Sequence, residues 1–170
     1  EFINQYPQSD ATTDFGFFFF FTAGVRKRVI ERVQPLKSQS AFLKLAPTNW
    51  SEQFTQSATA RKLEYCEFLR KTRFILCPRG YGVGSARVFE ALQAGRVPII
   101  ISDNYVMPEG IDWPSCSLRI KERDVGLIPE LVERNLPQWS LLSENASKIF
   151  SRNFSDEAIA NYIITQLEQL

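Results

Sequence analysis

Residues 73–101 decide the fold, and they read RFILCPRGYGVGSARVFEALQAGRVPIII. The apolar run at 73–77 stops at a proline and predicts a buried strand. Residues 85–94 have helical spacing, and Gly95 follows them, as is favoured just past the end of a helix. Residues 97–101 are a second apolar run. A strand, a glycine-rich loop, a helix and another strand in this order predict a βαβ unit and a parallel sheet.

The flanking sequence repeats this alternation of apolar runs and helical patterns. Further strands are expected at 15–22, 41–46 and 116–120, and helices at 25–33, 58–71, 125–135, 138–150 and 156–167. In the helix at 58–71 we expect Leu63, Cys66 and Leu69, with Arg70, to form the inner stripe. Residues 1–14 have the composition of an incoming linker, and 48–57 that of a polar loop holding Trp50. The predicted fold class is α/β, a Rossmann-like parallel sheet flanked by helices.

Composition excludes several classes of function. The 170 residues suit one domain, and 20 basic against 19 acidic residues leave a net charge of +1. That balance gives no electrostatic reason to expect a nucleic acid or an acidic membrane surface as a partner. The chain has no histidine, and its three cysteines form no CxxC pair. A zinc site, a Ser-His-Asp triad and a Cys-His dyad are therefore excluded, and three buried thiols are expected.

The N-terminal part of the sequence bears on membrane segments and on whether the chain is a fragment. The longest apolar run, at 15–21, is far too short to cross a bilayer and lacks the basic leader and cleavage site of a signal peptide. We therefore expect no membrane segment in this chain. It begins with Glu1 rather than methionine, which indicates a fragment, a processed form or an excised domain.

Ligands of open parallel sheets bind beyond the carboxyl ends of the strands, here at the loops 22–26, 78–85 and 102–110. In the middle loop Gly80, Gly82 and Gly84 alternate, which lets the backbone turn sharply and approach a ligand closely. The dinucleotide fingerprint GxGxxG fits at Gly80 and Gly82 but has Ser85 at its third position, and it would follow the third strand rather than the first. This weakens the hypothesis of a dehydrogenase.

The end of this loop has the chemistry of an anion site. Ser85 is predicted to be the N-cap of the next helix, so that the free amides of residues 86–88 point outward. Arg79 and Arg87 add positive charge, and the sum suits a diphosphate. The alternative is a tight turn with a capped helix and two solvent-facing arginines.

Three further residues have both a binding and a structural interpretation. Glu90 lies one turn into the helix and can accept two hydrogen bonds from ribose hydroxyls, or form a surface ion pair with Arg87. Arg26 can reach a phosphate from the first loop, or belong to a solvated basic turn. Asp103 follows a strand and can hold sugar hydroxyls, or cap a turn.

Residues 77–91 read CPRGYGVGSARVFEA and resemble the exostosin-family signature CPxGxxxxSxRxxEA. The resemblance continues through GRVPIIISD at 95–103 and MPEG at 107–110 to DW at 112–113 and CSLRI at 116–120. It is good over residues 73–135, with a weaker echo at 15–28. The same stretch is similar to the wider class of two-domain GT-B glycosyltransferases, which bind the nucleotide in their C-terminal domain.

The resemblance implies a role for each of these residues. Glu90 would hold the ribose, and amides near Ser85 would hold the diphosphate together with Arg87 and Arg26. Arg79, Gly82 and Gly84 would shape the donor site, and Asp103 would face the donor sugar. Exostosin-like enzymes invert the anomeric centre and as a rule need no metal or cofactor. UDP is the expected nucleotide, and GDP remains an alternative.

The resemblance also implies the domain organisation. After the linker at 1–14, residues 15–140 would form the donor-binding domain, and 141–170 the C-terminal helices of the same domain. The expected partners are a nucleotide sugar, a glycan acceptor and an N-terminal GT-B domain, which would carry the acceptor site and the catalytic base. Because this chain has room for one Rossmann-like domain, we expect it to bind the donor without completing the transfer alone.

Two other functions are alternatives to donor binding. A non-catalytic module of the same fold would hold a nucleotide or a protein partner, and it has no need of Ser85, Arg87 and Glu90 together. A nicotinamide-dependent oxidoreductase would need a glycine fingerprint after residues 15–21, and the sequence TAG at 22–24 is not one. We expect a cytoplasmic location, with the Golgi lumen as the alternative.

Overall fold

The computed structural model describes residues 3–20, 24–33, 41–46 and 56–169. These residues form a parallel five-stranded sheet in the order β2-β1-β3-β4-β5. Its strands are β1 (Thr13–Phe20), β2 (Ala41–Ala46), β3 (Thr72–Pro78), β4 (Val97–Ile101) and β5 (Leu118–Ile120). The parallel sheet expected from the sequence is therefore confirmed.

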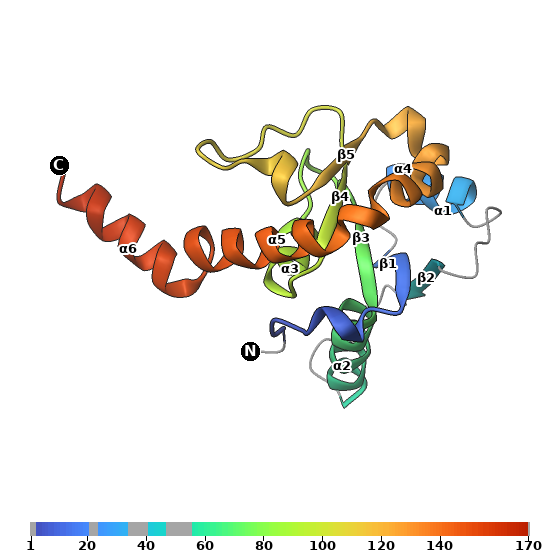
Figure 1. Cartoon of the computed structure of the whole chain (residues 1–170), viewed down its shortest axis with the longest axis horizontal. Coiled ribbons are helices and arrows are strands. Elements are labelled where there is room, and N and C mark those ends of the chain that lie inside the picture. The colour runs from blue at the N-terminus through green and yellow to red at the C-terminus, as the bar shows by residue number, and fades with distance from the viewer. Residues whose placement is uncertain (1–2, 21–23, 34–40, 47–55, 170) are drawn as a thin grey trace.

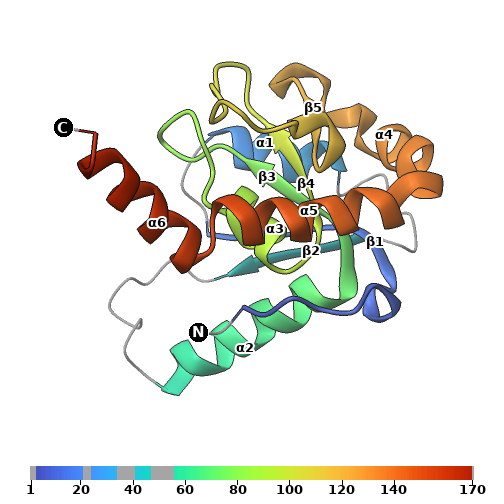
Figure 2. The ribbon, with the colours of Figure 1, turned by 60° about the vertical axis from the view of Figure 1, so that its left-hand side comes forward.

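Helices cover both faces of this sheet (Figures 1 and 2). They are α1 (Gly24–Val33), α2 (Gln56–Lys71), α3 (Arg87–Gln93), α4 (Ile128–Asn135), α5 (Trp139–Asn153) and α6 (Asp156–Leu167). One buried cluster joins the sheet to α1 and α4, and the other joins it to α2 and α3. Trp139 and Leu142 of α5 belong to the first cluster and Ala146 to the second, so this helix packs against both. α6 projects beyond the sheet with no buried residue (Figure 1).

The phenylalanine run of β1 is buried on both faces, as its continuous apolar pattern predicts. Phe15 and Phe17 lie in the cluster with α1, whereas Phe18 lies in the cluster with α2. Gly16 permits this close packing, since a Cβ atom there would lie 2.6 Å from the ring of Phe68 on α2. The alternation of side chains along a strand explains the division into two cores.

Several predicted boundaries shift in the structure. β1 begins two residues early because Thr13 pairs with Thr72. β5 begins at Leu118, since Cys116 instead ends a 3-10 turn over Trp113–Ser115 (η4). The helix expected at 125–135 is divided into a 3-10 segment, η5 (Glu122–Leu127), and α4. The polar loop expected around Trp50 lies almost wholly outside the described residues.

The prediction for the inner stripe of α2 was partly wrong. Cys66 and Leu69 are buried, but Leu63 is 59% exposed. Phe68 occupies the core in its place, where its ring packs 5.8 Å from Phe18. The helix therefore turns a more aromatic face to the sheet than the spacing of leucines indicated.

Residues 3–11 pack along the folded body. The amide of Tyr6 donates to the carbonyl of Ala94 at 3.3 Å, and the side chain of Gln8 donates to the carbonyl of Ser140 at 2.8 Å. Ala11 is buried in the core. The division of the chain into linker, donor-binding domain and C-terminal helices stays a prediction.

The cysteines match their expected character. Cys66, Cys77 and Cys116 are all buried thiols, and none of them is joined in a disulfide among the described residues. Burial raises the pKa of the Cys77 thiol well above its ordinary value, and raises that of Cys116 to about 11. No helix among the described residues combines the length and apolar content needed to cross a bilayer.

Candidate functional site

The candidate site lies where the chain changes direction across the sheet. From β1 the chain continues outward to β2, whereas β3 continues to β4 and β5 on the other side. The segments that follow β1 and β3 therefore diverge, and a crevice at the carboxyl ends of these strands is the usual ligand position in such a fold. The start of α1 and the loop after β3 are both at this edge of the sheet, beside the loop after β4 (Figure 2).

The loop after β3 is held in shape by its own backbone and by β4. The amide of Gly80 donates to the carbonyl of Gly84 at 3.2 Å, which closes the turn. The hydroxyl of Ser102, just past β4, donates to the carbonyl of Val83 at 2.7 Å. The loop is therefore preorganised on both sides.

The three glycines of the loop have different surroundings. A Cβ atom on Gly84 would lie 3.0 Å from the ring of Tyr105, so the absence of a side chain at Gly84 leaves room for this ring. A Cβ atom on Gly80 would lie 3.6 Å from Nη2 of Arg26, whereas at Gly82 it would meet nothing within 4 Å among the described residues. The space over Gly82 is the part of the loop open to a ligand.

Ser85 does not cap α3, which corrects the prediction. The N-cap position is Ala86, and it has no side-chain cap. Val88 donates its amide to the carbonyl of Ser85 at 3.2 Å, so one of the amides expected to be free is used. The Oγ atom of Ser85 is buried and has no hydrogen-bond partner within the part of the chain that the structure describes. Ser85 Oγ is therefore an unsatisfied polar atom at the end of the loop, just before α3.

Arg26 and Arg87 bring two guanidinium groups together at this point. Burial lowers the pKa of Arg26, and the positive charge of Arg87 lowers it further. The side chain of Arg87 is only 13% exposed, and its Nε atom is buried with no hydrogen-bond partner among the described residues. Positive charge is thus concentrated beside an open loop, as an anion site requires.

Glu90 lies beside this pair and has two donors. The hydroxyl of Tyr65 on α2 donates to its Oε2 atom at 2.5 Å, and Nη1 of Arg87 donates to the same oxygen at 3.4 Å. The guanidinium carbon of Arg87 also lies 5.3 Å from the centroid of the Tyr65 ring. Burial raises the pKa of Tyr65 well above 10; the charge of Arg87 opposes that rise, and the carboxylate of Glu90 adds to it.

Arg79 and Asp103 are engaged elsewhere in the structure. Nε of Arg79 donates to Oε1 of Glu122 at 2.6 Å. Nη2 of Arg28 donates to Oε2 of the same carboxylate at 3.1 Å. Oδ1 of Asp103 accepts the amide of Glu122 at 3.0 Å. Both predicted site residues therefore hold the start of η5, and the guanidinium of Arg79 is engaged in an ion pair with Glu122.

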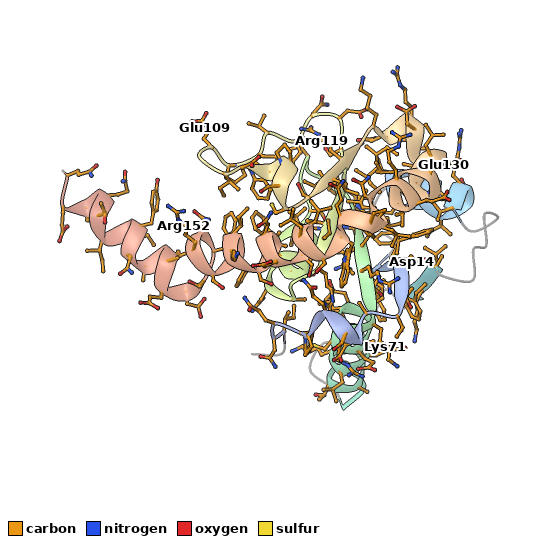
Figure 3. All side chains as sticks on the ribbon, viewed as in Figure 1. Asp14, Lys71, Glu109, Arg119, Glu130 and Arg152 are labelled. Atoms are coloured by element: carbon orange, nitrogen blue, oxygen red, sulfur yellow. The ribbon has the colours of Figure 1, made fainter. Side chains whose placement is uncertain are left out.

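A hollow of about 730 Å³ opens beyond the carboxyl ends of β4 and β5. It is lined by Ser102, Asp103, Arg119, Ile120, Lys121 and Arg123. Nη2 of Arg119 donates to the carbonyls of Ser102 and Tyr105 at 3.2 and 3.0 Å, and so fixes the loop that borders the hollow (Figure 3). Asp103 lines this hollow, whereas Glu90 is not among its lining residues.

Two partners of the predicted site residues carried no signal in the sequence. Tyr65 lies on a different helix from Glu90, 25 positions away, and the contact arises from packing of α2 beside α3. Glu122 lies 43 positions from Arg79. A pattern of residues along the chain does not reveal contacts that the tertiary structure makes.

Residues 12–135 match the family model of the Exostosin GT47 domain. Exostosin-1 homolog of Caenorhabditis elegans is 46% identical over 71 residues, which are 41% of this chain and 19% of that protein. Exostosin-1 of Drosophila melanogaster is 32% identical over 111 residues, which are 63% of this chain and 14% of that protein. The chain thus spans less than a fifth of the length of these relatives.

Comparison with solved structures supports the same fold. The C-terminal domain of a glycosyl transferase group 1 family protein from Francisella tularensis superposes with a TM-score of 0.58 at 11% identity, covering 91% of this chain and 97% of that domain. TarM superposes with a TM-score of 0.52 at 10% identity, covering 95% of this chain and 36% of TarM. The predicted fold class, a Rossmann-like domain of the GT-B type, is confirmed.

Proposed function

Because the chain belongs to the exostosin GT47 family, we propose that it is the donor-binding domain of a glycosyltransferase that transfers a sugar from a nucleoside-diphosphate sugar to a glycan. One observation carries the proposal. Arg26 near the start of α1, and Ser85 and Arg87 after β3, lie on the segments that follow the carboxyl ends of β1 and β3, where a parallel sheet of this order binds its ligand.

The diphosphate is the group that this cluster fits. Ser85 Oγ and Arg87 Nε are buried donors without partners among the described residues, and leaving such a group unsatisfied costs about 1–3 kcal/mol. Phosphate oxygens accept hydrogen bonds from both, and the charge of Arg26 adds to the attraction. The open space over Gly82 leaves room for the ligand.

The remaining parts of the donor fall on neighbouring residues. Glu90 lies one turn along α3 from the cluster, and its carboxylate accepts hydrogen bonds from ribose hydroxyls. Asp103 borders the hollow beyond β4, where the donor sugar would lie. We propose UDP as the nucleotide, with no metal or further cofactor in the site.

The proposed transfer inverts the anomeric centre of the sugar. The acceptor hydroxyl oxygen attacks the anomeric carbon, the bond from that carbon to the diphosphate oxygen breaks, and a base takes the hydroxyl proton. Arg26 and Arg87 stabilise the negative charge that grows on the departing nucleoside diphosphate. In this proposal the acceptor-binding site and the base lie on an N-terminal domain of the whole protein, with which this chain would form the complete site.

Replacing Arg87 by alanine tests the diphosphate role. We expect the affinity for UDP to fall about 10- to 100-fold, because hydrogen bonds between charged groups are lost, whereas the affinity for uridine falls much less. Isothermal calorimetry with UDP, UMP and uridine measures the trend. Arg134→Ala, an exposed arginine of α4, is the matched control and should leave all three affinities unchanged. Equal losses for UDP and uridine would remove Arg87 from the phosphate site.

A further inference from the structure

We infer that Tyr65 is a positioning residue that anchors one oxygen of Glu90, so that the other faces the ribose of the bound nucleotide. The inference rests on the proposed function, and it assigns Tyr65 a role in donor binding that its place in the middle of α2 does not suggest. Four features of the structure support it.

The first feature is the distribution of hydrogen bonds over the carboxylate. Tyr65 Oη and Arg87 Nη1 both donate to Oε2 of Glu90. Oε1 accepts no hydrogen bond from the described residues, and the side chain of Glu90 is 33% exposed. One oxygen of Glu90 is thus anchored by two donors, and the other is left to accept hydrogen bonds from a ligand.

The second feature is the rigidity of the anchor. The ring of Tyr65 meets Phe18 of β1 edge-on, with centroids 5.5 Å apart, and stacks on Phe68 of its own helix at 5.9 Å. Both phenylalanines are buried in the core. Because packing against these two rings restrains the Tyr65 ring, the position of its hydroxyl is set jointly by β1 and α2.

The third feature is the contact of Tyr65 with the second charged group of the site. The guanidinium of Arg87 lies over the Tyr65 ring, 5.3 Å from its centroid. A cation over an aromatic face is attracted to it, so the same ring also restricts Arg87. Tyr65 therefore touches both the residue proposed for the ribose and the residue proposed for the diphosphate.

The fourth feature is the protonation state of the phenol. Burial raises the pKa of Tyr65 well above 10. At neutral pH the hydroxyl keeps its proton and can act only as a donor toward Oε2. A fixed donor removes the need to order the carboxylate when the nucleotide binds, and preorganisation of this kind increases affinity.

Tyr65→Phe tests the inference, because it removes the hydroxyl and keeps the ring packing. We expect the affinity for UDP to fall about tenfold, the effect of one hydrogen bond to a charged group. The affinity for 2′,3′-dideoxy-UDP, which lacks the ribose hydroxyls, should be the same in the variant and the wild type. On a Glu90→Gln background the Tyr65 substitution should cause little further loss, since the two residues act as one unit.

The outcomes separate this inference from the proposed function. If the wild type binds UDP or GDP and Glu90→Gln weakens that binding, but Tyr65→Phe does not, the inference is overturned and the donor site stands. Equal loss on UDP and its dideoxy analogue would make Tyr65 merely structural and would also overturn it. If the wild type bound neither UDP nor GDP, the site and its positioning residue would fall together. Tyr162→Phe on exposed α6 is the matched control and should bind UDP as the wild type does.

Discussion

Replacing Arg96 by methionine is expected to lower the free energy of unfolding by about 3–5 kcal/mol. The side chain of Arg96 is fully buried, yet its guanidinium has no carboxylate bound to it in the described part of the chain. It instead donates to the backbone carbonyls of Leu69, Arg70, Tyr6, Pro7 and Gly95. Methionine fills much of the same space but removes the donor to the carbonyls of Leu69, Arg70, Tyr6 and Pro7, whereas the carbonyl of Gly95 still accepts from the hydroxyl of Ser143 at 2.7 Å.

The contacts of Arg96 join three parts of the chain. Leu69 and Arg70 end α2, Tyr6 and Pro7 belong to the N-terminal segment, and Gly95 follows α3. Burial lowers the pKa of Arg96 to about 10, so the side chain stays charged at neutral pH and its hydrogen bonds are charge-assisted. Loss of Arg96 should therefore also release the N-terminal segment from the body.

Urea denaturation measures the first effect, and hydrogen exchange at the amide of Tyr6 measures the second. The control is Arg152→Met, an exposed arginine near the end of α5 (Figure 3), for which we expect a change below about 0.5 kcal/mol. A loss of stability at Arg96 no greater than that of the control would show that the carbonyls find other donors.

Gly95→Ala is expected to destabilise the chain by about 2–4 kcal/mol. Gly95 has a φ of +67°, and together with Arg96 it closes α3 through hydrogen bonds to the carbonyls of Leu92 and Ala91. A Cβ atom there would be strained by the backbone and would lie 2.6 Å from Oγ of Ser147 on α5. Both effects act against the folded state, and thermal or urea denaturation measures their sum.

Gly110→Ala separates the two effects. Gly110 has a similar φ of +76°, but a Cβ atom there would meet nothing within 4 Å among the described residues. We expect a loss of about 1–2 kcal/mol from backbone strain alone. Equal losses at the two positions would mean that Ser147 moves aside freely and that crowding against α5 contributes nothing.

The parts of the fold that the sequence predicted well are those with local causes. The apolar runs of β2 and β4 and the helical pattern of α6 were placed at their observed bounds, and Gly95 was identified as the residue past a helix end. The spacing of apolar residues in α2 predicts Leu63 in the core, but Leu63 is exposed, because this spacing does not fix which face of the helix meets the sheet. Cys116 extended a predicted strand because its apolar character does not reveal a 3-10 turn.

The candidate site divides in the same way. The loop after β3, Arg87 and Glu90 are neighbours along the chain, so their proximity follows from the signature itself. Ser85 was predicted to cap α3, and the structure instead leaves its hydroxyl buried and without a partner among the described residues. The partners of Glu90 and Arg79, which are Tyr65 and Glu122, come from distant elements and depend on how the helices pack on the sheet.

The most direct test of the central claim is a calorimetric titration of the chain with UDP, GDP and NADH, repeated with Glu90→Gln. We predict that a nucleoside diphosphate binds, that NADH does not, and that the variant loses about tenfold or more in affinity while its melting temperature stays close to that of the wild type. Binding of neither UDP nor GDP by the wild-type chain, or binding that the variant retains in full, would contradict the assignment of a donor site at the carboxyl ends of β1 and β3.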